Sequence, residues 1–247
     1  MRHIHLRVLA IAALAALLSL PATTARLTAG PVTNPDQQGA GALDARPLPA
    51  HATYRGLTYG EWLARWWQEG FATWELGSDP AVSGVFGGSD GMIFLQAPVL
   101  PAGSPKVTIH ATIPPGTPLF FPIITVECSV AEAPPFHGED EAELRACANG
   151  LLDLVTEPYA RIDDSTVEDP AAYRMDSPLF RYGPLPETNV LGLPPGTQSD
   201  AVGAGYFLLL PPLSAGLHRI DVRAAVPAIG IAVDTEFIIH VEPMPRR

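Results

Sequence analysis

The stretch KVTIHATIPPGTPLFFPIITV, residues 106–126, contains two strand patterns separated by a turn. In 106–113 apolar and polar residues alternate, the period expected of an antiparallel strand with one buried face. Residues 114–117 have the Pro and Gly content of a turn. Residues 119–126 are apolar on both faces, and Pro122 among them predicts an edge strand or a bulge. The inward set of the first strand is Val107, Ile109, Ala111 and Ile113.

Short strand patterns recur along the rest of the chain and are separated by many of its 22 glycines and 27 prolines. The segment LPPLSAGLHRIDV, residues 210–222, is typical of a corner across which two late strands pair. This spacing predicts a mostly β chain, an antiparallel β-sandwich of Ig-like or jelly-roll-like type with two short helices packed on it. The further strands are expected at 92–95, 206–210, 218–224 and 237–241.

The N-terminal region has the pattern of an export signal. Residues 1–25 combine two arginines, a short apolar run and a small-residue exit. A permanent membrane anchor is the alternative, but the run is shorter than the ~20 apolar residues of a spanning helix. Residues 26–53 are rich in Gly, Pro, Ala and Thr and predict a flexible leader. We therefore expect a secreted or periplasmic protein with no integral membrane segment after processing and one sandwich domain at 54–243.

The charge balance is strongly acidic. The chain has 15 basic and 26 acidic residues. Removal of residues 1–25 takes away two arginines, so the mature balance is 13 − 26 = −13. Such a field repels nucleic acid, which is therefore excluded as a partner.

The segment YGEWLARWWQEG, residues 59–70, carries three of the four tryptophans. Thr58 and Glu61 are spaced as a capping box, in which each side chain satisfies the other residue's backbone N–H. Gly70 suits a left-handed helix end. These features predict a helix over 59–69.

The tryptophans of this helix are expected in the core, because a short helix depends on tertiary packing and this one has a single apolar face. The alternative is an edge position where one indole could stack on a sugar. Trp74, just past the helix, is the more plausible exposed ring. The apolar face is expected to contain Tyr59, Trp62, Leu63, Trp66 and Trp67.

Cys128 and Cys147 are the only cysteines. Residues 140–155 predict a second helix whose apolar face includes Cys147. An even pair in an exported chain favours a disulfide over two free thiols. One pair of cysteines without a CxxC motif argues against zinc or redox chemistry, and we expect no cofactor and no metal.

Few residues suggest chemistry. Glu127 follows an apolar strand and adjoins the expected disulfide, so partial burial is expected; that marks either a functional site or a structural hydrogen bond. The acidic runs at 139–143 and 163–164 fit a helix start and a turn, with a calcium site as the alternative for the first. None of the five histidines that remain after removal of residues 1–25 is spaced as HxH or HExxH.

Four segments together resemble a group of exported bacterial proteins to which no activity is attached. They are YGEWLARWWQ, PLFFPIITVECS, PPFHGEDEAELRACAN and LPPLSAGLHRIDV, in this order. The resemblance spans about residues 54–243. It implies export and a compact mostly-β domain, and it implies no catalytic residue.

These observations favour a non-enzymatic binding or surface-interaction module whose partner is a glycan or another exported protein. The candidate ligand-binding residues are Trp74, Tyr59 and Glu127. One alternative is a secreted polysaccharide hydrolase that uses Glu127 and a second acid. Another is a structural component of the cell envelope.

Overall fold

The computed structural model describes residues 45–75, 84–87 and 91–244. The expected signal peptide, and most of the expected leader, lie outside the described residues. The last part of that leader, 45–53, lies against the domain: Leu48 N–H donates to the carbonyl of Leu209 at 2.8 Å. The packed chain therefore begins before the expected boundary at residue 54.

The described strands form two six-stranded sheets and a two-stranded ribbon. The first sheet contains, in spatial order, β10 (Arg174–Asp176), β12 (Ser199–Leu210), β7 (Leu119–Ser129), β4 (Ile93–Leu95) and β3 (Val85–Gly87), with β11 (Phe180–Tyr182) also on β12. The second contains β5 (Leu100–Pro101), β14 (Ile231–Val241), β13 (Gly216–Val226), β8 (Thr156–Ile162) and β9 (Ser165–Thr166), with β6 (Val107–Ile113) also on β14. The ribbon pairs β1 (Thr53–Tyr54) with β2 (Leu57–Thr58).

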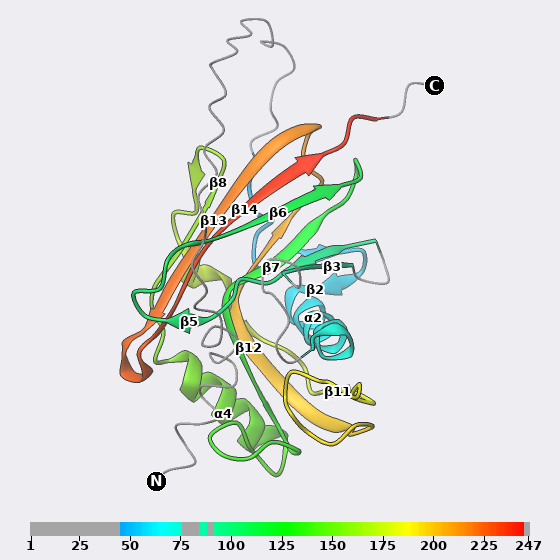
Figure 1. Ribbon diagram of the computed structural model, residues 1–247, viewed down its shortest axis with the longest axis vertical. Helices are drawn as coiled ribbons and strands as arrows, with labels where there is room; N and C mark the ends of the chain where they lie inside the picture. The colour runs from blue at the N-terminus through cyan, green and yellow to red at the C-terminus, as the bar shows by residue number, and fades with distance from the viewer. Residues whose placement is uncertain (1–44, 76–83, 88–90, 245–247) are drawn as a thin grey trace, which may run out of the picture.

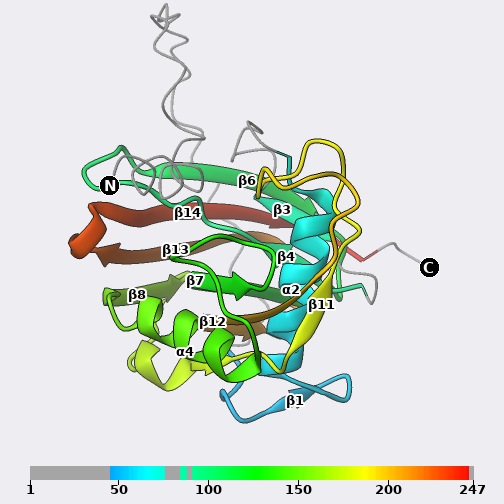
Figure 2. The same cartoon turned by 90° about the horizontal axis from the view of Figure 1, so that it is seen from below.

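The two sheets pack face to face, which confirms the sandwich class. Phe121 on β7 and Phe237 on β14 are buried between them, with ring centroids 6.5 Å apart. The opposite face of the first sheet packs against helix α2 (Tyr59–Thr73), so α2 and the second sheet lie on opposite sides of β7 and β12 (Figure 1). Helix α4 (Glu141–Leu152) packs on β7 and β12 beside the second sheet, well apart from α2 (Figure 2). Two short 3₁₀ helices are η2 (Pro170–Tyr173) and η3 (Pro227–Ile229).

Two expectations about strand pairing are wrong. β6 is a strand with one buried face, but it pairs in parallel with β14. The alternation of apolar and polar residues in β6 shows which face is buried, but it does not show whether the neighbouring strand is parallel or antiparallel. The turn after β6 leads into β7 of the other sheet. β12 and β13 likewise belong to different sheets and do not pair across the corner at 211–215. The prolines of that corner have no N–H with which to continue the ladder.

Helix α2 begins as expected, with both hydrogen bonds of the Thr58–Glu61 capping box present. Trp62 is 1% exposed, as expected of a core residue. The expected end at Gly70 is wrong, since the helix continues to Thr73. Gly70 serves packing instead: a Cβ there would lie 2.3 Å from the ring of Trp74, which folds back over it.

β7 has a bulge and an open edge, and both shape the candidate site. The pairing register with β12 shifts between Tyr206 and Phe207, opposite Pro122, so the expected bulge is confirmed. β4 pairs only with Leu119 and Phe120. Beyond Phe120, no described strand pairs with this edge of β7, and a cavity lies along it.

Candidate ligand-binding cavity

A cavity of about 340 Å³ lies along the open edge of β7. Its walls come from β7, from the end of α4, from the β13–β14 turn and from α2. This volume is within the range of small-molecule sites. Among the described residues that line it, none is Lys, Arg or His.

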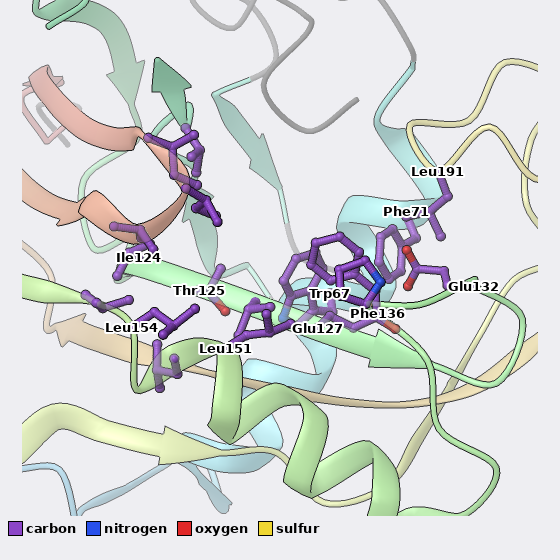
Figure 3. A pocket seen from close by; sticks show the side chains of 18 residues that line it. Trp67, Phe71, Ile124, Thr125, Glu127, Glu132, Phe136, Leu151, Leu154 and Leu191 are labelled. Carbon is purple, nitrogen blue, oxygen red and sulfur yellow. The ribbon is translucent and has the colours of Figure 1, made fainter. Parts of the chain in front are cut away.

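The two ends of the cavity differ in chemistry (Figure 3). Aliphatic side chains from β7 and α4 gather at one end, including Ile124, Leu151 and Leu154. Aromatic rings and two carboxyl groups gather at the other. Such a gradient suits an elongated ligand with an apolar tail and a polar head. The second end contains Trp67, Phe71, Phe136, Glu127 and Glu132.

Glu127 is the buried acid of this site. Its side chain extends from β7, where its neighbour on β12 is Gly203, and only 5% of the residue is exposed. The expected burial of Glu127 is thus confirmed. Its Oε1 has no hydrogen-bond partner among the described residues. Burial, and then the charge and hydrogen bond of Glu132, hold the pKa of Glu127 well above its usual value.

Glu132 connects Glu127 to a chain of hydroxyl groups. Ser129 Oγ donates to Glu132 Oε2 at 3.0 Å, and it lies 3.0 Å from the hydroxyl of Tyr182. Burial raises the pKa of Tyr182, which keeps this hydroxyl neutral. The charge of Glu132 opposes the ionisation of Glu127, because two neighbouring carboxylates do not easily ionise together in an apolar setting.

Trp67 forms the wall beside Glu127. A Cβ on Gly203 would lie 2.6 Å from its indole ring, so the missing side chain on β12 makes the space that Trp67 fills. The indole Nε1 is buried and has no hydrogen-bond partner in the described part of the chain. The sequence suggested Trp67 as a core residue; it is only partly buried and faces the cavity.

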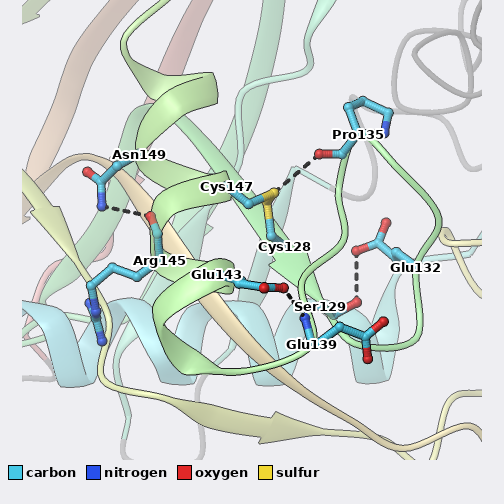
Figure 4. The surroundings of a disulfide bond; sticks show 9 residues. All are labelled: Cys128, Ser129, Glu132, Pro135, Glu139, Glu143, Arg145, Cys147 and Asn149. Atoms are coloured by element: carbon cyan, nitrogen blue, oxygen red, sulfur yellow. Dashed lines mark hydrogen bonds between the residues drawn. A yellow bond between two sulfur atoms is a disulfide. The ribbon is translucent and has the colours of Figure 1, made fainter.

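The Cys128–Cys147 disulfide is present as expected and joins the end of β7 to α4 (Figure 4). It closes a loop across a sequence separation of 19 that carries Glu132 and Phe136 into the cavity wall. Pro135 O lies 3.2 Å from Cys147 Sγ, a contact and not a hydrogen bond, since a disulfide sulfur carries no proton. The disulfide thus holds the acidic end of the cavity in place.

The expected exposure of Trp74 is wrong, since this residue is only 6% exposed and its ring lies 4.9 Å from that of Trp66. Its indole packs directly on Gly70, in the space that a side chain at position 70 would occupy. Tyr59 is 2% exposed, and its hydroxyl donates to the carbonyl of Leu48. Neither ring lines the cavity with Glu127, so the three candidate residues are not brought together.

A second constellation outside the cavity resembles a Ser-His-Asp set. His218 Nε2 lies 3.3 Å from Ser214 Oγ, and Nδ1 lies 2.8 Å from Asp163 Oδ2. However, Nε2 is also 3.0 Å from the carbonyl of Ser214, which can only accept. Nε2 therefore donates its proton to the main chain and cannot act as a base toward the serine. These contacts join the turn before β13 to the β8–β9 turn.

The described ranges were also considered for metal-binding clusters and for membrane-spanning helices. No group of three or more His, Cys, Asp or Glu residues there is arranged to hold a metal ion. None of the helices described is both long and apolar enough to cross a bilayer.

Comparison with family models and with curated proteins finds no match. Two solved structures show weak similarity. One is the solution structure of amebosin, with 8% identity, a TM-score of 0.18, and coverage of 56% of this chain and all of that one. The other is PbICP-C in complex with falcipain-2, with 12% identity, a TM-score of 0.22, and coverage of 60% and 97%. Similarity this weak does not identify a shared fold.

Proposed function

We propose that this protein is an exported, non-enzymatic binding module that takes an apolar small molecule into the cavity along β7. The observation that carries this proposal is Glu127, a buried acid whose Oε1 has no partner among the described residues, at one end of an otherwise apolar cavity. Buried polar groups are nearly always satisfied, and one that faces a cavity is a natural contact for a ligand.

The disulfide supports the exported part of the proposal, because such bonds persist in oxidising compartments outside the cytoplasm. The apolar lining favours a lipid-like or aromatic molecule over a glycan. Trp74 and Tyr59, the rings considered for sugar stacking, are buried.

The cavity does not favour glycoside hydrolysis. Apart from Glu127, Glu132 and Thr125, its described lining is aliphatic, aromatic or proline, so few side chains there could hydrogen-bond the hydroxyl groups of a sugar ring.

The test is a titration of the purified protein with N-phenyl-1-naphthylamine, a neutral probe that fluoresces in apolar sites. Leu151→Trp would place a large ring in the aliphatic end of the cavity. We expect it to weaken probe binding by about tenfold or more, equivalent to ~1.4 kcal/mol. Ala146→Trp is the matched control, since Ala146 lies on the exposed side of the same helix.

Circular dichroism would confirm that both variants fold. Absence of probe binding to the wild-type protein would contradict the proposal. Equal binding by the wild type and a folded Leu151→Trp variant would also contradict it.

A further inference from the structure

We propose that the preferred ligand is a cationic amphiphile, a primary alkylammonium whose chain lies in the aliphatic end of the cavity and whose head lies at Glu127 and Glu132. This inference rests on the proposed binding function and names the ligand class. Three features of the described cavity support it: the negative charge of its ionisable groups, the hydrogen bond that Glu127 Oε1 lacks, and the aromatic rings beside the two acids.

The first feature is charge. Both ionisable groups that line the cavity are acids, and its described lining contains no basic side chain. An anionic head group would meet two carboxyl groups, one of which already opposes the ionisation of the other, and like charges repel strongly in an apolar setting. A cation would instead supply the opposite charge that the lining does not provide.

The second feature is the missing hydrogen bond. Glu127 Oε1 is an acceptor without a donor among the described residues. An ammonium group has three N–H donors and no acceptor, so it complements this oxygen, although it offers no acceptor to Trp67 Nε1, the buried donor at the same end. Hydrogen bonds between an ammonium and a carboxylate are roughly twice as strong as neutral ones. A hydroxyl head group could also donate, but without the charge.

The third feature is the set of rings beside the acids. Trp67 and Phe71 have centroids 5.0 Å apart, and Phe136 belongs to the same end of the cavity (Figure 3). Aromatic faces attract cations through their quadrupole, and the attraction is stronger where water is excluded. Two acids and three rings together favour a cation over a neutral or anionic head.

Binding of a cation should also favour the ionised form of Glu127, so the affinity for the cation should rise with pH. The groups that face Glu127 are Glu132 from the loop after β7, Ser129 on β7 and the neutral Tyr182 on β11. α2 contributes Trp67 and Phe71, and α4 contributes aliphatic side chains, none of which titrates. The carboxyl pair is therefore the group at the head site that accounts for such a pH dependence.

The experiment compares three ligands with the same chain, decylammonium, 1-decanol and decanoate, by displacement of the neutral probe at pH 7. We expect decylammonium to bind about tenfold or more tightly than decanol, and decanoate to bind most weakly. Between pH 5 and pH 8 the affinity for decylammonium should rise and that for decanol should stay constant. Glu127→Gln should remove the preference for decylammonium and retain decanol binding, which also shows that the variant is folded.

Glu187→Gln is the matched control, because it makes the same Glu-to-Gln replacement at an exposed residue that does not line the cavity. It should retain the preference. If decanol or decanoate binds as well as decylammonium, the inference about the head group is overturned and the binding function stands. If none of the three ligands displaces the probe and the probe itself does not bind, the binding function is overturned as well.

Discussion

Glu127 and Asp221 are equally buried acids, each 5% exposed, in opposite surroundings. Asp221 on β13 accepts hydrogen bonds from Lys106 and from Arg161, whose Nη2 lies 2.8 Å away. Burial alone would raise the pKa of Asp221, but these two cations outweigh it and lower the pKa. Glu127 has a second acid as its neighbour, and its pKa is raised. Asp221 is paired with cations of the fold, whereas Glu127 lines a cavity and keeps one acceptor without a partner among the described residues.

The largest expected change in stability comes from removal of the disulfide, which lies near Glu127 and not near Asp221. Replacement of Cys128 and Cys147 by Ser should lower the free energy of unfolding by about 3 kcal/mol in the chain-entropy model. The loss should be accompanied by weaker probe binding, because the loop that carries Glu132 is released. Urea unfolding and probe titration measure the two effects.

The Asp221 side provides the control for this prediction. The loss caused by Asp221→Asn should add to that of the double serine variant, since the two sites share no partner. A double serine variant with wild-type stability and wild-type probe binding would contradict the role assigned to the disulfide.

Asp221→Asn should lower stability by about 1–2 kcal/mol at pH 7. The estimate is modest because the Lys106 and Arg161 side chains are 40% and 39% exposed, so solvent screens their charge. The folded pKa of Asp221 is depressed, so its contribution is present above the unfolded value of 3.8 and is lost as the pH falls through the folded pKa. The variant and the wild type should therefore converge in acid. A constant difference down to the lowest pH tested would argue against charge pairing; Glu168→Gln, an exposed acid, is the control.

Glu127→Gln should act with the opposite sign and raise stability by about 1 kcal/mol at pH 8. The folded pKa of Glu127 is raised, so its favourable contribution is complete below the unfolded value of 4.5 and is lost as the pH rises through the folded pKa. The variant should match the wild type near pH 4 and exceed it at pH 8 in urea unfolding. A variant that is less stable at pH 8 would show that this acid, like Asp221, has a structural partner.

The smallest expected effect belongs to Leu154→Ser at the aliphatic end of the cavity. Leu154 is an exposed apolar residue, so the change in stability should stay within about 0.5 kcal/mol. Its methyl groups nevertheless line the cavity, and the probe affinity should fall a few-fold. Unchanged affinity would place the bound molecule at the aromatic end only. Leu217→Ser, an exposed leucine that does not line the cavity, is the control.

The sequence predicted the elements of this fold better than their partners. Alternation in 106–113 identified β6 and its buried face, but its parallel neighbour β14 lies more than 100 residues away, and local pattern holds no information on direction. The capping box gave the start of α2 correctly. The end of α2 was predicted wrongly because Gly70 does not terminate the helix. It makes room for the ring of Trp74, which folds back onto it.

The candidate site was predicted in part. The position of Glu127 after an apolar strand indicated burial, but no sequence pattern marked Glu132, which lies in the loop that the disulfide closes. Trp67 was assigned to the core because its own helix pattern places it there. One signal was available: Gly203 interrupts an apolar strand, and glycine in a strand often marks the close approach of another group. That group is the indole of Trp67.

The open edge of β7 has a consequence for the chain before its disulfide forms. Unpaired strand edges are templates on which other chains add, and natural proteins cover them or shorten them. Here the far end of the edge is covered by the loop after β7, through a bond from Ser129 N–H to Phe136 O, and the Cys128–Cys147 bond fastens that loop. In a reducing compartment the loop is released and a longer edge is uncovered, so we expect the reduced protein to self-associate and the oxidised one to stay monodisperse.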